Sequence, residues 1–180
     1  QDLTPYFLTA NHCLGGESNW IFMFNYESSG CTNQNGPTNM TVQGSTLLVN
    51  SSTSDVALLE LDENPPLSYE VHYSGWDATG ETPSIPVGIH HPSGDIKKIS
   101  FDYNNASNSG NFWDIDSWDD GTTEPGSSGS PLFDGVTHRI IGQLYGGVAS
   151  CTNFGYDTYG KVSTSWNLGL ENYLDPDNTG

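Results

Sequence analysis

The segment "TEPGSSGSPLFD", residues 123–134, is the stretch on which the fold class and the functional argument turn. A proline and two glycines surround the pair Ser127 and Ser128, and the short apolar run "PLF" follows almost directly. Glycine permits backbone conformations that other residues rarely adopt, so we expect a sharp turn before a strand. Such a turn can direct the amides of Gly126 and Ser128 toward one point, which is the arrangement that stabilises a developing oxyanion.

The rest of the chain has the pattern of short strands. Apolar, aromatic and β-branched runs alternate with clusters of Gly, Pro, Asn, Asp and Ser, which is typical of antiparallel barrels and sandwiches. The expected strands are 6–10, 20–26, 41–49, 55–61, 69–76, 84–91, 97–103, 130–133, 139–147 and 160–166. Only residues 166–176 have a helical apolar period, and they predict one short C-terminal helix. The sequence therefore predicts an all-β fold.

A linker is expected at residues 61–68, "LDENPPLS", because paired prolines do not fit inside a central strand. This linker divides the chain into an N-terminal β unit at 1–62 and a larger C-terminal unit at 63–175. The C-terminal unit ends with the predicted helix, and residues 176–180 form a tail.

Composition excludes several classes of partner. The 180 residues include 22 acidic and only four basic side chains, for a formal net charge of −18. No basic patch is possible, so nucleic acid is not an expected partner. No run of 18 apolar residues is present, so we expect no membrane span. His90 and His91 are adjacent on a predicted strand and point to opposite faces, so no metal site and no cofactor are expected.

Three residues in the order His12, Asp55 and Ser128 suggest nucleophilic catalysis. A hydrolytic serine needs a base within hydrogen-bond reach and a third group that orients the base. His12 follows the strand signal at 6–10, and Asp55 precedes the apolar run "VALLEL". Taken singly, each has an ordinary explanation as a surface histidine, a turn aspartate or a loop serine. Their order in an all-β chain is that of one class of catalytic triad.

These segments resemble chymotrypsin-like serine proteases. The runs "FLTANHC", "SDVALLEL" and "GSSGSP" correspond to the histidine, aspartate and serine motifs of that group. From Tyr6 to Pro176 the chain is more closely similar to the bacterial lysyl endopeptidases, through "SGWD", "GIHHPSGDIKKIS", "IGQLYGG" and "DTYGKVSTSW". The resemblance implies two antiparallel six-stranded β-barrels with a short C-terminal helix.

The resemblance also implies roles for the candidate residues. His12 would be the general base, Asp55 its orienting acid and Ser128 the nucleophile that forms an acyl-enzyme. The backbone amides of Gly126 and Ser128 would form the oxyanion hole. The implied activity is that of a secreted, monomeric serine endopeptidase.

Specificity follows from the same resemblance. Asp157 matches the acid at the base of the primary specificity pocket, so cleavage after basic residues is expected, with Lys preferred and Arg as the alternative. Gly146 and Gly147 match the strand that pairs with the substrate backbone. Tyr145 replaces a histidine that lines the cleft in the lysyl endopeptidases. The family's cleft tryptophan has no assigned counterpart in the shortened segment 101–118.

The three cysteines, Cys13, Cys31 and Cys151, form an odd set. In the lysyl endopeptidases each counterpart bridges to an upstream segment that also supplies the first strands of the N-terminal barrel. We therefore expect that this chain is a fragment or one chain of a nicked enzyme, with an incomplete first barrel and the missing segment as its partner. Two alternatives remain open: a non-catalytic binding module of the same fold, and an unrelated adhesin or carbohydrate-binding β-domain.

Overall fold

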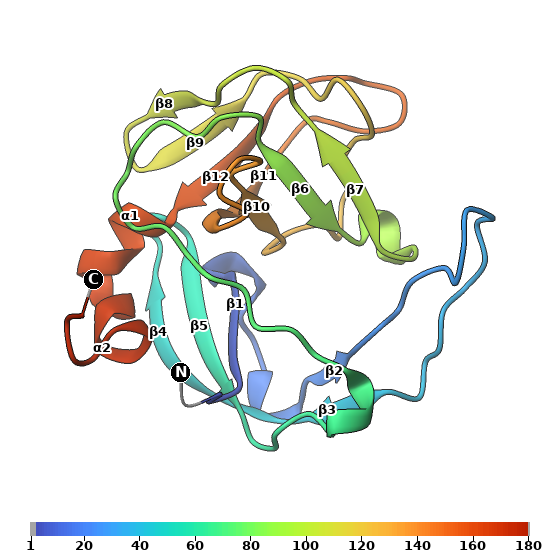
Figure 1. The fold of residues 1–180 in the computed structure, drawn as a ribbon, viewed down its shortest axis with the longest axis vertical. Coiled ribbons are helices and arrows are strands. Elements are labelled where there is room, and N and C mark those ends of the chain that lie inside the picture. Colours follow the sequence, from blue (N-terminus) through green and yellow to red (C-terminus); the bar gives the residue numbers. More distant parts are fainter. Residues whose placement is uncertain (1–2, 180) are drawn as a thin grey trace.

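The computed structural model describes residues 3–179, in which twelve strands form three antiparallel sheets (Figure 1). The strands are β1 (Tyr6–Ala10), β2 (Ile21–Met23), β3 (Thr41–Gln43), β4 (Ser45–Ser51), β5 (Val56–Leu61), β6 (Val87–His90), β7 (Lys98–Phe101), β8 (Ser107–Ser109), β9 (Phe112–Ile115), β10 (Pro131–Phe133), β11 (Ile140–Gly147) and β12 (Asp157–Lys161). The predicted all-β class is confirmed.

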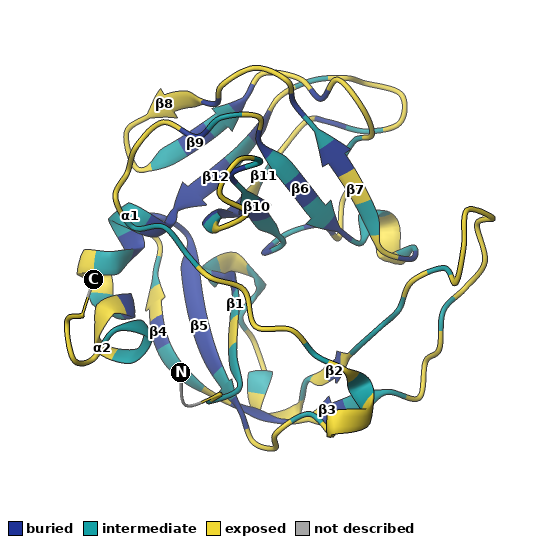
Figure 2. Cartoon of the chain, in the orientation of Figure 1, coloured by how far each residue is buried: buried dark blue, intermediate teal, exposed yellow. Residues whose placement is uncertain are grey.

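The N-terminal strands form two small sheets, one ordered β1-β5-β4 and one that pairs β2 with β3. The central strand β5 is buried along most of its length because its residues are apolar on both faces (Figure 2). Phe22, Val42, Leu59 and Leu61 form one core cluster between these sheets.

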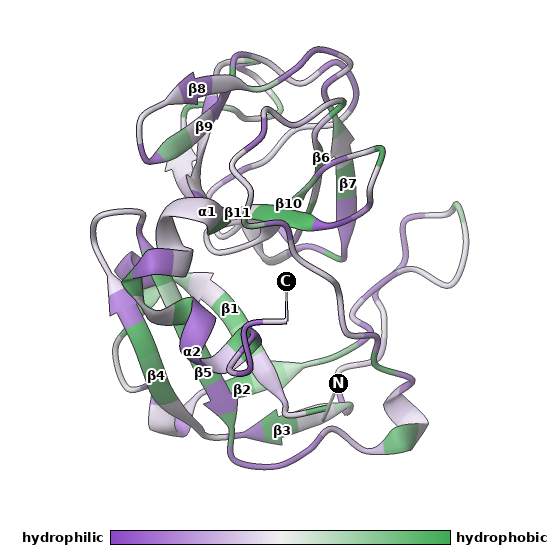
Figure 3. Cartoon of the chain, turned by 60° about the vertical axis from the view of Figure 1, so that its left-hand side comes forward, coloured by the Kyte–Doolittle hydropathy of each residue, from purple (hydrophilic) through white to green (hydrophobic). Residues whose placement is uncertain are grey.

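The C-terminal strands form one seven-stranded sheet in the order β7-β6-β10-β11-β12-β9-β8. Its core includes Trp113, Ile115, Leu132 and Tyr159, each at most 1% exposed. Strands such as β10 consist mainly of hydrophobic residues, whereas much of the connecting loops is hydrophilic (Figure 3). Hydrogen bonding within residues 3–179 leaves all three sheets open, so the strands do not close into complete barrels.

The C-terminal helical segment begins earlier than the predicted 166–176, because residues of the predicted strand 160–166 form α1 (Val162–Ser165). One π-helical turn at Trp166–Leu170 and α2 (Glu171–Leu174) follow it. Gly169, with a φ of 124°, interrupts regular helix geometry. The buried Leu170 packs against Val49, Val56 and Leu58 of the first sheet. The segment therefore packs against the N-terminal half of the protein, as Figure 1 shows, although it follows the strands of the C-terminal half in the sequence.

The structure corrects several predicted elements. Residues 69–76 form no strand; they are largely exposed, and the backbone of Trp76 forms an isolated bridge to Ile140. The expected strand at 41–49 is divided at Gly44, where φ is 86°. The strand predicted at 160–166 lies at 157–161. Strands β8 and β9 were not predicted, because the polar, exposed β8 has no apolar alternation.

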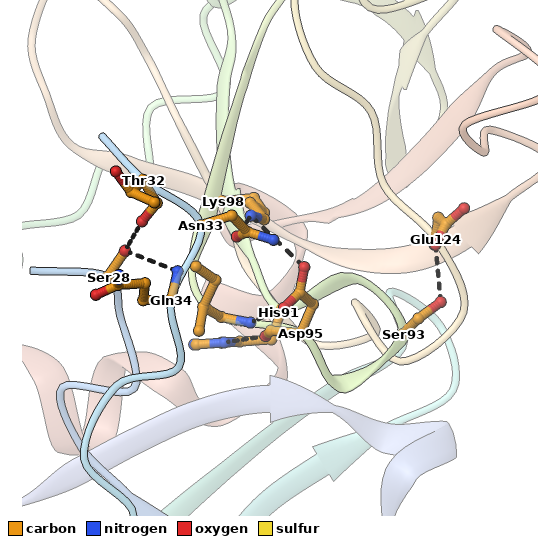
Figure 4. Close-up of polar contacts among 10 residues, drawn as sticks. Ser28, Thr32, Asn33, Gln34, His91, Ser93, Asp95, Lys98 and Glu124 are labelled. Carbon is orange, nitrogen blue, oxygen red and sulfur yellow. Dashed lines mark hydrogen bonds and ion pairs between the residues drawn. The ribbon is translucent and has the colours of Figure 1, made fainter. Parts of the chain in front are cut away.

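A second contact between the halves involves the long loop after β2. Lys98 bonds Asn33 and Asp95, and Ser28 binds both Thr32 and Gln34 within the loop (Figure 4). The Lys98–Asn33 bond fastens the loop to β7 of the C-terminal sheet. No helix among residues 3–179 has the length and apolar character required to cross a bilayer.

Candidate active site

His12 and Asp55 form a direct polar pair at the junction between the halves. The imidazole Nδ1 lies 2.6 Å from Asp55 Oδ2, and the His12 amide donates to Oδ1 at 2.9 Å. Because a carboxylate only accepts hydrogen bonds, Nδ1 carries the proton and Nε2 is left as the acceptor nitrogen. Asp55 is 4% exposed. The pair therefore fixes both the ring orientation and its tautomer.

The backbone holds Asp55 in an unusual conformation. Its φ is 54°, in the left-handed region that aspartate tolerates better than most residues. Its carbonyl accepts a hydrogen bond of 2.8 Å from the Asn11 amide, next to His12. The β4–β5 turn thus presents the carboxylate directly to the segment that follows β1.

Ser128 lies in a turn that packs against β1 and β11. The Gly129 amide donates to the Leu144 carbonyl, and the Leu144 amide donates to the Ser130 carbonyl, both at 2.8 Å. A Cβ on Gly129 would lie 2.2 Å from Thr9 Oγ1, so glycine allows the turn to approach β1. This approach places Ser128 close to the chain segment that carries His12.

The amides of Gly126 and Ser128 are available for a ligand. Among the hydrogen bonds within residues 3–179, neither amide is a donor to another protein group. Gly126 has a φ of 94°, which allows the sharp turn predicted from the sequence. Within residues 3–179, no hydrogen bond joins Ser128 Oγ to the His12 ring. In unliganded sites such bonds are often long and tighten when substrate binds.

A pocket of about 340 Å³ opens beside Ser128. It is lined by Thr123, Glu124, Pro125, Ser128, Leu144, Gly146, Gly147, Val148, Ala149, Ser150 and Asp157. A Cβ on Gly147 would lie 2.2 Å from Asp157 Oδ1, so this wall packs tightly on the acid. The lining thus includes both the acid Asp157 and the hydroxyl-bearing Ser128.

Asp157 lies buried at this pocket, with only 1% of its surface exposed. Its Oδ2 accepts hydrogen bonds from Trp118 Nε1 at 2.7 Å and from Thr123 Oγ1 at 2.6 Å. Burial raises the pKa of the Asp157 carboxyl, and the two hydrogen bonds oppose part of this increase. A cationic ligand group would relieve the cost of the buried charge.

Glu124, which also lines the pocket, connects two loops. One carboxylate oxygen accepts from the Cys151 amide at 3.2 Å, and the other accepts from the Ser93 hydroxyl at 2.8 Å (Figure 4). These bonds, led by the one from Ser93, lower the pKa of the Glu124 carboxyl. The acid therefore connects the β11–β12 loop to the loop before β7.

An aromatic pair lies beside the imidazole. Tyr145 on β11 makes an edge contact with His12 at a centroid distance of 6.0 Å, and the ring of Phe112 on β9 lies 5.5 Å from that of Tyr145. Trp113 is instead 1% exposed and lies under the Lys161 ammonium. The aromatic residue from this strand that lies near the cleft is therefore Phe112.

His90 lies behind the Ser128 turn and is 1% exposed. Its Nε2 is 2.9 Å from Ser100 Oγ and its Nδ1 is 3.4 Å from Ser127 Oγ. Burial, with a smaller contribution from His91, lowers the pKa of His90 to about 4. At neutral pH the ring is therefore uncharged.

A larger cavity of about 640 Å³ lies behind the same turn, between the two halves. Its lining is mainly apolar and includes Leu8, Leu58, Trp76 and Tyr173. It has no buried carboxylate comparable to Asp157, so the smaller pocket is the better candidate for specific recognition. Cys13, Cys31 and Cys151 are free thiols in the described chain.

The structure brings together most of the residues selected from the sequence. His12 pairs with Asp55 and contacts Tyr145, while Ser128, Gly146, Gly147 and Asp157 all line one pocket. Sequence reasoning missed four further residues: Phe112, Trp118, Thr123 and Glu124. Thr123 and Glu124 begin the quoted segment, but nothing in the local pattern indicates that one contacts Asp157 and the other Cys151.

Solved structures with this arrangement of strands are chymotrypsin-like serine proteases. The thermostable serine protease AL20 from an extremophilic microorganism matches with a TM-score of 0.70 and 16% identity, over 99% of this chain and 87% of that one. A Glu endopeptidase in complex with MPD matches with a TM-score of 0.61 and 16% identity, over 91% and 78%. The fold is therefore chymotrypsin-like.

The sequence comparisons define the family within this fold. Residues 1–160 match the family "Lysyl endopeptidase, C-terminal domain". The lysyl endopeptidase of Pseudomonas aeruginosa is 33% identical over 164 residues, which cover 81% of this chain and 34% of that protein. The chain belongs to the lysyl endopeptidase family. It spans about a third of the length of this curated relative.

The buried His90 predicts a specific dependence of stability on pH. An unfolded histidine takes up its proton near pH 6.5 and the folded His90 only near 4, so the unfolded state binds more protons between these values. As pH falls from 6.5 to 4, the free energy of unfolding should decrease by about 2–3 kcal/mol because of this group. Urea unfolding across this range measures the effect.

His90→Gln should flatten this dependence, whereas His72→Gln, at an exposed position, should leave it unchanged. An identical pH dependence in the His90 variant and the unaltered protein would show that this histidine does not cause the loss.

Proposed function

We propose that this protein is a serine endopeptidase that cleaves peptide bonds after basic residues, through an acyl-enzyme formed on Ser128. The observation that carries the proposal is the His12–Asp55 pair together with a pocket that is lined by Ser128 and by the buried acid Asp157. Membership of the lysyl endopeptidase family supports the same activity.

The proposed mechanism follows from the geometry. Asp55 holds the Nδ1 proton, so the free Nε2 of His12 accepts the proton of the Ser128 hydroxyl as its oxygen attacks the substrate carbonyl. The amides of Gly126 and Ser128 then stabilise the oxyanion. His12 next protonates the leaving amine, and a water molecule, deprotonated by the same ring, hydrolyses the acyl-enzyme. Beyond Leu144, the β11 edge opposite β12 has no strand neighbour among residues 3–179, so substrate backbone can pair there.

Specificity for a basic side chain follows from Asp157. A lysine or arginine of the substrate would neutralise the buried carboxylate, whereas a neutral side chain would leave it unpaired. A substrate glutamate would place a second negative charge beside it, so specificity of the kind named for the Glu endopeptidase is disfavoured here. We propose Lys as the preferred residue and Arg as the alternative.

Covalent labelling tests the proposed nucleophile. A serine-directed phosphonate reagent should add once, at Ser128, in the full-length protein. In His12→Ala the rate should fall by roughly 10³-fold or more because the base is lost, while His72→Ala should react like the unaltered protein. Peptide mapping by mass spectrometry locates the adduct. A properly folded protein without labelling at Ser128 would instead support the non-catalytic binding module.

Asp157→Asn tests the pocket. Cleavage after Lys and Arg should fall by roughly 100-fold or more, because the cationic side chain loses its counter-charge. The free energy of unfolding should stay equal or rise, because a buried charge has been removed while Trp118 and Thr123 keep an oxygen acceptor. Peptide cleavage assays and urea unfolding measure the two effects.

Asp116→Asn, at an exposed position after β9, is the matched control and should change neither quantity. Unchanged cleavage after Lys in Asp157→Asn would show that another group recognises the substrate.

We further propose that the protein is secreted and that an upstream segment of a longer form pairs with Cys13, Cys31 and Cys151. The free thiols, the apolar cavity between the halves and the greater length of the P. aeruginosa relative support this partner. Peptide mapping of the full-length protein without reductant should show each cysteine bridged to a cysteine outside residues 1–180. A Cys13–Cys31 bridge, or three free thiols, would contradict the proposal.

A further inference from the structure

Gln143 on β11 is a buried polar side chain that has no role in the proposed mechanism. It is 0% exposed, and its Nε2 donates a hydrogen bond of 2.7 Å to the Ser54 carbonyl. Ser54 directly precedes Asp55, so this bond links the C-terminal sheet to the turn that carries the acid. The orientation of the amide is fixed by chemistry, because its oxygen would repel the carbonyl.

Ser54 is closely packed by residues of three surrounding elements. Gly160 pairs with Gln143 across β11 and β12, and a Cβ at Gly160 would lie 1.8 Å from the Ser54 carbonyl oxygen. The Ser54 hydroxyl lies 2.8 Å from Ser165 Oγ, which donates to the Lys161 carbonyl at the same distance. Ser54 is therefore held from β11, β12 and α1 at once, and it is fully buried.

This arrangement is not explained by stability alone. Gln143 Oε1 is buried without a hydrogen-bond partner among residues 3–179, which is unfavourable compared with an apolar side chain of similar size. Asp55 also has a left-handed backbone that needs support from its surroundings. The Gln143 amide, with a bonded nitrogen and an unbonded oxygen, thus lies next to the turn that holds Asp55 in this conformation. This arrangement is consistent with a positioning role.

The same strand also holds the Ser128 turn. Leu144, the neighbour of Gln143, exchanges backbone hydrogen bonds with Gly129 and Ser130. Two consecutive residues of β11 therefore contact the turn that carries the acid and the turn that carries the serine.

We propose that Gln143 is a positioning residue. By holding the Ser54 carbonyl, it fixes the position of Asp55, so that the carboxylate binds His12 and the pair is correctly placed relative to the Ser128 turn. The inference rests on the proposed function for its catalytic consequence. Its structural consequence, a fixed His12–Asp55 hydrogen bond, is independent of whether Ser128 reacts.

The test uses Gln143→Met in the full-length protein, because methionine has a similar length but no donor. We expect kcat to fall at least 10-fold with KM within twofold, since the substrate pocket is untouched. The low-field proton NMR resonance of the His12 Nδ1–H bond to Asp55 should broaden or move upfield. Gln143→Asn, whose amide is one methylene shorter, should show the same changes and serves as a second variant if the first does not fold.

Two controls separate positioning from stability. Gln43→Met, at an exposed position of β3, should leave kcat, KM and the resonance unchanged. Leu59→Ala removes buried core volume in the N-terminal half and should lower the melting temperature while keeping the resonance and kcat below that temperature.

An unaltered resonance and a kcat within twofold in the folded Gln143 variants would overturn the proposal. Loss of the resonance to the same extent in Leu59→Ala would also overturn it, because general destabilisation would then be the cause. Failure of the unaltered protein to label at Ser128 would refute the proposed function, while the resonance would still report on Gln143.

Discussion

The fixed spacing of residues along β11 is the constraint on which the candidate site depends. Gln143 contacts the turn before Asp55, Leu144 binds the Ser128 turn through two backbone hydrogen bonds, and Tyr145 touches the His12 ring. Gly147 packs against Asp157. Because successive residues of a strand are separated by about 3.3 Å, these contacts set the positions of four parts of the site relative to one another.

Two buried titratable groups, Asp157 and His90, lie near this strand, and burial disfavours the ionised form of each. Burial raises the pKa of Asp157 and lowers that of His90 to about 4. Both shifts mean that the folded protein resists charging the group in place. Asp157 is suited to a cationic ligand for this reason, whereas the neutral His90 can support the Ser128 turn by hydrogen bonding. These positions thus have a cost in stability, which the proposed recognition of a basic side chain would explain.

The sequence predicted the parts of the fold that local pattern controls. Residues 6–10 form β1 as expected, because the run consists mainly of apolar and aromatic residues, which suit a short strand. The aromatic run 69–76 was mispredicted because its residues suit a strand but find no partner strand. The hairpin β8–β9 was missed because its polar residues are ordered by pairing with one another and with β12. For the site, the serine turn and the order of the three motifs were readable, while the partners of Asp157 were not.

By itself, the sequence determined the all-β class, the glycine-rich turn around Ser128 and the family, because these depend on residue type, order and local backbone preference. Only the tertiary structure decided which side chains meet: Phe112 rather than Trp113 beside Tyr145, Trp118 and Thr123 on Asp157, and Gln143 on the Ser54 carbonyl. These pairs are separated by 33 to 89 positions along the chain. No local periodicity specifies such contacts, because they arise when separate sheets pack and bury their polar groups against one another.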